Sequence, residues 1–131
     1  MRPTHSPHPD LAVRYRAAGH WRDRTVDHFL ERAAARYPDT VAVIDGDRRL
    51  TFADVEQQSL RLAAALHDRG VQPGDVVSFQ LPNSAEAVVV FHAIQRVRGI
   101  ANPIVPIYRE REVGFILGQA GTKVAFVPGT H

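Results

Sequence analysis

The sequence predicts an α/β fold built on a three-stranded parallel β-α-β-α-β unit. Three short apolar runs occur at Asp75–Leu81, Ile100–Val105 and Lys123–Val127. The two segments between these runs are longer, and their apolar residues recur with helical spacing. Connections of this length join parallel strands through right-handed crossovers, whereas antiparallel neighbours need only a tight turn. The rest of the chain is expected to pack onto this unit.

Composition limits the class of protein. The chain has 131 residues, 44% hydrophobic and 23% charged, which is typical of one modest globular domain. The 16 basic and 14 acidic residues are dispersed and leave a net charge of only +2, so we expect no nucleic-acid partner. There is no cysteine, and therefore no disulfide or cysteine-based zinc site. No run is apolar enough for a membrane span or a secretory signal, so a cytoplasmic location is expected.

We expect residues 1–24 to form an arm outside the core. Met1–Asp10 contains prolines among polar residues and is expected to be mobile. Leu11–Arg24 contains the only tryptophan, Trp21, and is expected to lie across the domain with this side chain as its anchor. The alternative is an exposed aromatic recognition element.

Residues 25–131 are expected to form an incomplete α/β subdomain. Its first helix is predicted to have Thr25 as its N-cap and to stop before Pro38. The apolar positions of this helix share one face: Val26, Phe29, Leu30, Ala33 and Ala34. A β-hairpin is predicted to follow, with strands Val41–Ile44 and Arg48–Thr51. Asp45-Gly46 suits the positive φ angles of its tight turn.

The second helix begins at a predicted capping box. Thr51 and Asp54 have the spacing for reciprocal hydrogen bonds at a helix N-terminus. The helix is expected to end at Gly70, in the C′ position. Its expected buried residues are Phe52, Val55, Leu62 and Leu66.

The helices of the parallel unit carry two further expectations. Asn83 and Glu86 are predicted to cap the helix Ala85–Arg98, which is apolar over more than half its circumference. Such a helix needs cover on two sides, the second from outside this short chain. In the last helix, Glu110–Ala120, Gly114 and Gly118 each cost about 1 kcal/mol relative to alanine, so we expect close packing against a neighbour there.

No self-contained catalytic site is evident. Neither a G-x-x-x-x-G-K-[ST] loop nor a G-x-G pair is present, and the histidines have no metal-ligand spacing. His92 lies within an apolar helix and is expected to be a buried, hydrogen-bonded structural residue. No nucleophile elbow occurs, so Ser78 is interpreted as a strand residue and Ser84 as a neighbour of a cap.

One edge of the predicted sheet could carry a ligand site. Ligands of open parallel sheets gather at the carboxyl ends of the strands. Those ends are Leu81-Pro82-Asn83, Val105-Pro106-Ile107-Tyr108 and Val127-Pro128-Gly129. From the residues alone it stays open whether these segments bind a ligand or only turn the chain.

The same residues resemble a known family. Leu50-Thr51-Phe52-Ala53-Asp54-Val55 is similar to the Leu-Thr-Tyr-x-Glu-Leu element of adenylate-forming acyl-CoA synthetases. The stretch GVQPGDVVSFQLPNSAEAVVVFHAIQRVRGIANPIVP is similar to that superfamily's "G-v-x-p-G-D-x-V-a" strand and the "a-G-a-x-x-x-P-i" element after it. The resemblance covers Tyr15–His131 in unbroken order. This superfamily includes acid–CoA ligases, aryl-acid–AMP ligases and the adenylation domains of peptide synthetases.

The resemblance implies the N-terminal portion of an acid–CoA ligase. Family members use ATP with Mg to convert a carboxylic acid into an acyl-adenylate, and most then transfer the acyl group to CoA. Their phosphate loop, ribose-binding Asp and catalytic Lys lie beyond this chain, so no catalytic or metal-binding residue carries over. The chain alone is expected to be inactive and to bind none of these cofactors tightly. In some relatives the loop after the second parallel strand lies near CoA, which would make Pro106, Ile107 and Tyr108 candidate cofactor-binding residues.

The type of ligase and the acid that it uses have more than one interpretation. Asn102–Pro106 and Arg109–Glu112 look nearer to ligases of medium-chain or cyclic acids, which suggests fatty acid metabolism. Tyr15–Trp21 suits both these ligases and aryl-acid–AMP ligases. A non-catalytic α/β interaction module is a further alternative. The apolar helix and unpaired strand edges predict that the chain self-associates or packs with the remainder of a larger domain.

Overall fold

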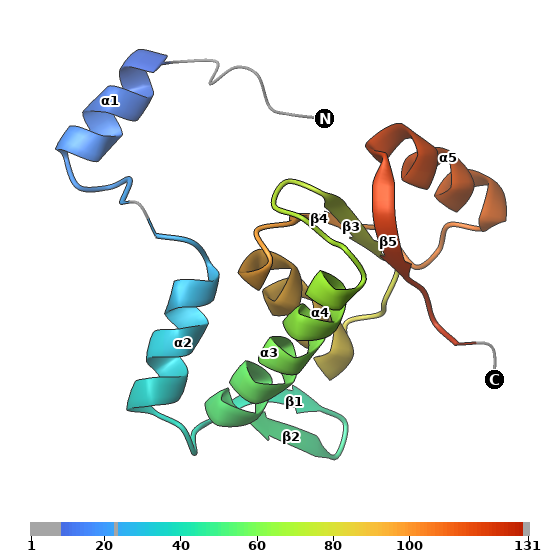
Figure 1. Cartoon of the computed structure of the whole chain (residues 1–131). Coiled ribbons are helices and arrows are strands. Elements are labelled where there is room, and N and C mark those ends of the chain that lie inside the picture. The colour runs from blue at the N-terminus through green and yellow to red at the C-terminus, as the bar shows by residue number, and fades with distance from the viewer. Residues whose placement is uncertain (1–8, 23, 130–131) are drawn as a thin grey trace.

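A computed structural model describes residues 9–22 and 24–129 and confirms the α/β class (Figure 1). The elements in chain order are α1 (Pro9–Ala17), α2 (Asp27–Arg36), β1 (Val41–Asp45), β2 (Arg48–Thr51), α3 (Phe52–Asp68), β3 (Val76–Phe79), α4 (Ala85–Arg96), β4 (Ile100–Pro103), α5 (Glu110–Ala120) and β5 (Thr122–Phe126). None of these helices is both long and apolar enough to cross a bilayer.

The predicted parallel sheet is present, with β3 at its centre. The strand order is β4-β3-β5, and both neighbours run parallel to β3. All four residues of β3 are buried, as expected for a central strand covered on both faces. The first crossover runs from β3 to β4, and the second runs back from β4 past β3 to β5, so α4 and α5 lie on opposite sides of the sheet (Figure 1).

The hydrophobic core lies between the sheet, α4 and α3. Its buried members are Ala63, Leu66, Val71, Val77, Phe79, Val90, Ala93 and Ile94. No apolar side chain of α4 is exposed, because α3 covers the side that the sheet leaves open. The expectation that α4 needs a partner from outside the chain is therefore wrong.

Both ends of α3 lie where the sequence predicts them. Thr51 Oγ1 accepts a hydrogen bond from the Asp54 N–H at 3.1 Å, and the Asp54 carboxylate accepts one from the Thr51 N–H at 2.9 Å. This capping box also lowers the pKa of Asp54, because the carboxylate accepts hydrogen bonds from the Thr51 backbone and hydroxyl. At the other end, Gly70 has a φ of 80°, as its predicted C′ position requires. Val55 and Leu66 are buried as predicted, whereas Phe52 and Leu62 are only half-buried.

The hairpin supplies the cap that α4 lacks locally. Gly46 has a φ of 58°, but Asp45 pairs with Arg48 as the last residue of β1 and does not adopt the predicted positive φ. The Asp45 carboxylate instead accepts a hydrogen bond from the Ala85 N–H at 3.0 Å. The predicted Asn83 cap is wrong, because Ser84 is the N-cap residue and makes no capping bond with its side chain. A carboxylate distant in the sequence satisfies this helix end.

The start of α2 also differs from the prediction. Val26, not Thr25, occupies the N-cap position, and it offers no side-chain hydrogen bond. Val26 already has helical dihedral angles, so the chain enters α2 without the extended residue that a side-chain cap requires. The helix ends at Arg36, before Pro38 as predicted.

The arm is partly helical, and residues 1–8 of the predicted mobile segment lie outside the described chain. Residues 9–17 form the helix α1. Trp21 is 47% exposed, and the Arg16 guanidinium lies 4.7 Å from the centre of its ring. Trp21 therefore contacts its own arm and is not buried as an anchor in the core. Its exposed aromatic ring keeps the recognition alternative open.

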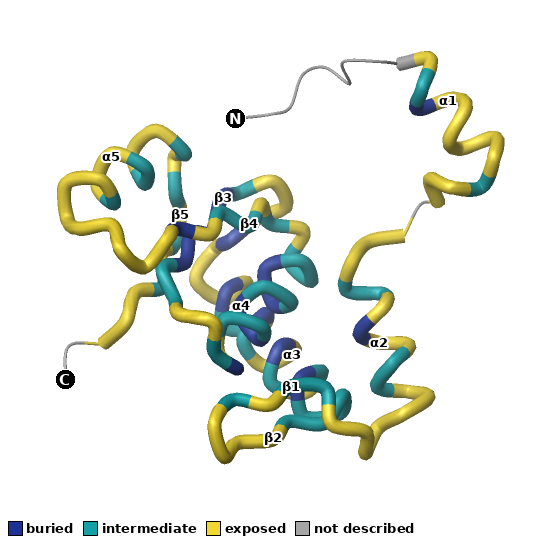
Figure 2. The backbone as a smooth tube through the Cα atoms, turned by 180° about the vertical axis from the view of Figure 1, so that it is seen from behind, coloured by how far each residue is buried: buried dark blue, intermediate teal, exposed yellow. Residues whose placement is uncertain are grey.

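Helix α5 is the least covered element of the parallel unit. None of its residues is buried, as its largely exposed trace shows (Figure 2). Cβ atoms added at Gly114 or Gly118 would meet nothing within 4 Å. Within the described chain, the expected close packing against these glycines is absent.

Candidate functional site

The carboxyl ends of the three parallel strands form one edge, as their parallel order requires. The Gln80 N–H donates a hydrogen bond to the Phe126 carbonyl at 2.8 Å, and the Ile104 N–H donates one to the Phe79 carbonyl at 2.8 Å. These bonds extend the pairing by one residue beyond β3 and β4. The chain segments that leave β3, β4 and β5 consequently begin side by side.

Gln80 holds the loop that follows β4. Its side-chain amide nitrogen lies 2.8 Å from the Tyr108 carbonyl oxygen, 3.1 Å from that of Val105 and 3.4 Å from that of Pro106. Three carbonyls of one loop therefore converge on a single donor group. Because the backbone is held from inside, the loop presents side chains outward, and Ile107 is 76% exposed.

The sequence-predicted residues Pro106, Ile107 and Tyr108 are all exposed on this loop. Of the other candidate segments, Val127-Pro128-Gly129 is exposed as well, and in Leu81-Pro82-Asn83 only Leu81 is half-buried. Sequence reasoning missed Gln80. The available signal was a polar residue directly after a mostly apolar strand, at the edge where ligands of parallel sheets gather.

A polar ladder crosses the sheet on one face. The Asn102 side-chain amide donates a hydrogen bond to Ser78 Oγ at 2.9 Å, and Ser78 Oγ shares another with Thr122 Oγ1 at 2.6 Å. Ser78 is fully buried, as its interpretation as a strand residue implies. One side chain from each strand is thus joined in a single network, which ties both edge strands to β3.

A hollow of about 420 Å³ lies beside the loop. It is lined by Tyr108, Arg111, Glu112, Phe115 and Ile116. Phe115 is 68% exposed. The first turn of α5 is exposed and charged, and the Arg109 N–H donates to the Glu112 carboxylate at 3.1 Å. The lining is suited to contact with apolar groups.

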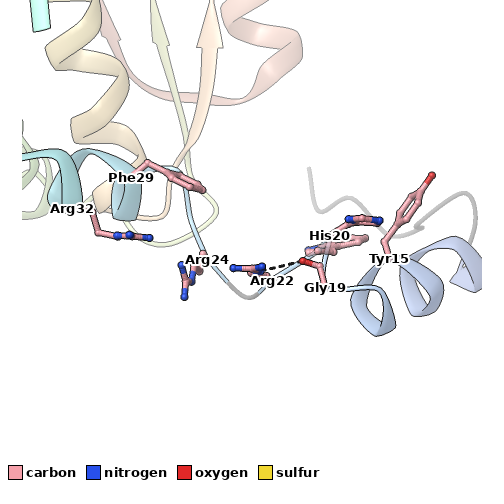
Figure 3. A pocket seen from close by; sticks show the side chains of 8 residues that line it. Tyr15, Gly19, His20, Arg22, Arg24, Phe29 and Arg32 are labelled. Carbon is pink, nitrogen blue, oxygen red and sulfur yellow. Dashed lines mark hydrogen bonds between the residues drawn. The ribbon is translucent and has the colours of Figure 1, made fainter.

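A second hollow, of about 860 Å³, lies between the arm and α2 (Figure 3). Its lining is Tyr15, Gly19, His20, Trp21, Arg22, Arg24, Phe29 and Arg32. The Arg22 guanidinium donates a hydrogen bond to the Gly19 carbonyl at 3.1 Å. The hollow is rich in arginine and aromatic rings, but no described group within it is arranged as an acid–base or nucleophilic pair.

His92 belongs to the packing of α4. It is half-buried, and its Nδ1 is buried without a hydrogen-bond partner in the described chain, so only part of its expected role is met. Burial lowers the pKa of His92, and the charge of Arg96 lowers it further, against a smaller opposing effect of Asp27. Arg96 in turn forms an ion pair with Glu56 of α3. Among the residues described, no three His, Asp or Glu side chains are placed to hold a metal ion.

Comparison with known proteins identifies the family. The AMP-binding enzyme family matches residues 30–131, which is most of the chain. The chain therefore belongs to the AMP-binding enzyme family, in agreement with the resemblance noted from its motifs.

Two curated relatives and one solved structure are similar to this chain. The chain is 45% identical over 110 residues to a salicyl-AMP ligase / salicyl-S-ArCP synthetase of Mycobacterium tuberculosis, covering 80% of this chain and 20% of that protein. It is 40% identical over 121 residues to a salicylyl-CoA synthase / salicylate adenylyltransferase of a Streptomyces species, covering 91% and 22%. The apo structure of Mycobacterium smegmatis MbtA superposes with a TM-score of 0.79 at 37% identity, covering 87% and 22%. The chain thus spans about a fifth of the length of these relatives.

Proposed function

We propose that this chain is the N-terminal portion of an adenylate-forming ligase that activates an aryl carboxylic acid. The 45% identity to a salicyl-AMP ligase is the observation that carries the proposal. A second relative is also named for salicylate. These names favour the aryl-acid alternative over the medium-chain acids that the wording of Asn102–Pro106 suggests.

The proposed reaction has two steps. A carboxylate oxygen of the acid attacks the α-phosphorus of ATP, and the bond to the bridging oxygen breaks to release pyrophosphate. A thiol then attacks the acyl carbonyl, loses its proton, and displaces AMP. Mg bound with ATP would offset the charge of the phosphates. The thiol would belong to CoA or to a carrier protein, because one relative is named for each.

This chain does not contribute the reacting groups. It lacks a glycine-rich phosphate loop with its lysine, so the residues present do not fit ATP or Mg, and no step is assigned to them. Its role in the proposed ligase is structural, as a pre-formed βαβ layer of the large domain.

A CoA-facing role for the loop after β4 remains part of the proposal. The carbonyl oxygens of Val105, Pro106 and Tyr108 face the side-chain amide of Gln80. A cofactor would meet the exposed side chains of Ile107 and Tyr108 and the ring of Pro106. Such contacts suit the apolar parts of CoA.

A chimera tests the proposed function. The matched N-terminal segment of the Mycobacterium tuberculosis salicyl-AMP ligase is replaced by this chain, and ATP–pyrophosphate exchange is measured over a panel of carboxylic acids. We expect salicylate-dependent exchange within about tenfold of the parent, since the reacting groups are retained. The isolated chain should show none. A folded chimera without exchange would contradict the proposal and favour the non-catalytic interaction module.

A further inference from the structure

We propose that the hollow between the arm and α2 is a binding site for an aromatic anion, which is a flat ring that carries a carboxylate or a phosphate group. This hollow of about 860 Å³ is called the arm hollow below (Figure 3). Seven of its eight lining residues precede residue 30, where the match to the AMP-binding enzyme family begins. The site is therefore additional to the proposed function and does not depend on it.

The arm hollow is cationic. Arg22 and Arg24 line it from the segment after α1, and Arg32 lines it from α2 (Figure 3). Within the described chain, none of these arginines pairs with a carboxylate. The Arg22 hydrogen bond to Gly19 uses Nε, so its terminal nitrogens can contact a ligand. Because a guanidinium group presents its donors in a planar fork that matches carboxylate and phosphate oxygens, the charge of the hollow selects an anion.

Aromatic rings line the same hollow. Tyr15, Trp21 and Phe29 are 49%, 47% and 61% exposed. Exposed faces of large aromatic rings are suited to stacking against another flat group. The Arg16 guanidinium lies over the Trp21 ring and adds a positive charge beside it. A ligand that combines a flat ring with an anionic group would therefore use both kinds of side chain.

The arm holds two of these rings in place before any ligand binds. The His20 and Trp21 N–H groups donate to the Tyr15 carbonyl at 2.9 Å and 3.0 Å. Gly19 has a φ of 72°, which permits this turn at the end of α1. The Arg22 guanidinium closes the turn through the Gly19 carbonyl. Because the turn fixes Tyr15 relative to Trp21, less entropy is lost on binding.

The size of the arm hollow fits a small molecule. Small-molecule sites have volumes of about 300–1,000 Å³ and combine aromatic walls with a few polar groups. The arm hollow meets both conditions. An acidic peptide would use the same arginines but would leave the rings without a stacking partner, and it is tested as the competing ligand.

Fluorescence tests the arm hollow, since Trp21 is the only tryptophan of the chain. The full chain is titrated at pH 7 and constant ionic strength with benzoate and with AMP, with excitation at the red edge of tryptophan absorption. We expect a saturable change with at least one of them. Saturation by benzoate assigns a carboxylate ligand, and saturation by AMP assigns a phosphate ligand. Acetate, inorganic phosphate, triglutamate and benzyl alcohol should give no saturable change, because each lacks either the ring or the charge.

Paired substitutions test the cations. Arg24→Gln with Arg32→Gln removes two charges from the arm hollow and should raise the dissociation constant at least tenfold. Arg36→Gln with Arg61→Gln is the matched control, because these exposed arginines of α2 and α3 lie outside the lining. The control should change the dissociation constant by less than about twofold. Far-UV circular dichroism establishes that each variant is folded.

Calorimetry tests the rings without the fluorescent reporter. Trp21→Ala should weaken binding of the saturating ligand at least fivefold. The matched control is Tyr37→Ala, because Tyr37 is 50% exposed and has the Arg36 guanidinium 5.3 Å from its ring centre, but lies outside the arm hollow. This control should leave binding unchanged.

Three results would overturn the proposed site. They are the absence of saturation with both benzoate and AMP, equal binding of any of the four compounds that lack the ring or the charge, and equal losses in the substituted and control proteins. Pyrophosphate exchange by the chimera reports only on the proposed function, so failure of either proposal leaves the other standing.

Discussion

At the scale of single residues, Ser78 joins the edge strands to the centre of the sheet. Ser78→Ala would leave the Asn102 amide and the Thr122 hydroxyl without the hydroxyl that both now contact. We expect a loss of about 1–2 kcal/mol in the free energy of unfolding, measured by urea denaturation. Thr40→Ala, at an exposed position, should change it by less than about 0.5 kcal/mol. Equal effects of the two substitutions would contradict the role of the ladder.

His92 makes stability depend on pH. Because burial lowers its pKa in the folded state, the unfolded chain binds this proton more readily. The stability that neutral His92 contributes to the folded chain is fully present above pH 6.5, the ordinary pKa of histidine. It is lost as the pH falls below that value. We expect the urea midpoint to decline between pH 7 and pH 5, and His92→Gln to decline less steeply. Parallel slopes for the two proteins would count against this assignment.

At the scale of elements, Thr51 and Thr25 allow a controlled test of helix capping, because both precede a helix but only Thr51 is an N-cap residue. Thr51 accepts the Asp54 N–H at the start of α3, whereas Thr25 is not the N-cap of α2. We expect Thr51→Ala to cost about 1 kcal/mol in guanidinium denaturation, and Thr25→Ala to cost less than about 0.5 kcal/mol. A larger effect at Thr25 would show that the start of α2 has been assigned to the wrong residue.

The capping prediction succeeded at α3 and failed at α4 for a physical reason. The α3 box is local, since Thr51 and Asp54 are three residues apart and need no other part of the fold. At α4 the Ala85 N–H is satisfied by Asp45, which is 40 residues away. Arg48 of the same hairpin contacts Glu86, and this hydrogen bond lowers the pKa of that carboxyl group. Spacing rules cannot reveal a cap supplied by another element.

At the scale of the whole molecule, the exposed apolar side chains predict association. Ile107 and Phe115 are among the most exposed large hydrophobic residues of the described chain. We expect the isolated chain to bind a hydrophobic dye and its light scattering to rise with concentration. A monodisperse monomer without dye binding would contradict the expectation.

The sequence by itself determined the parallel unit, the hairpin, the start and end of α3 and the family. These features depend on contacts between near neighbours in the chain or on apolar periodicity, and both are visible in a single sequence. The motifs also led to the loop Pro106–Tyr108, although they did not reveal what holds it.

Only the tertiary structure decided which surfaces are covered and which polar groups meet. In the folded chain α3 covers α4, whereas no residue of α5 is buried. The Gln80 side chain lies beside carbonyls of the loop after β4, which are 25–28 residues further along the chain. The reason is that an amphipathic pattern specifies that a face must be buried but not against what. Long-range hydrogen bonds likewise depend on how the elements are placed, which local spacing does not encode.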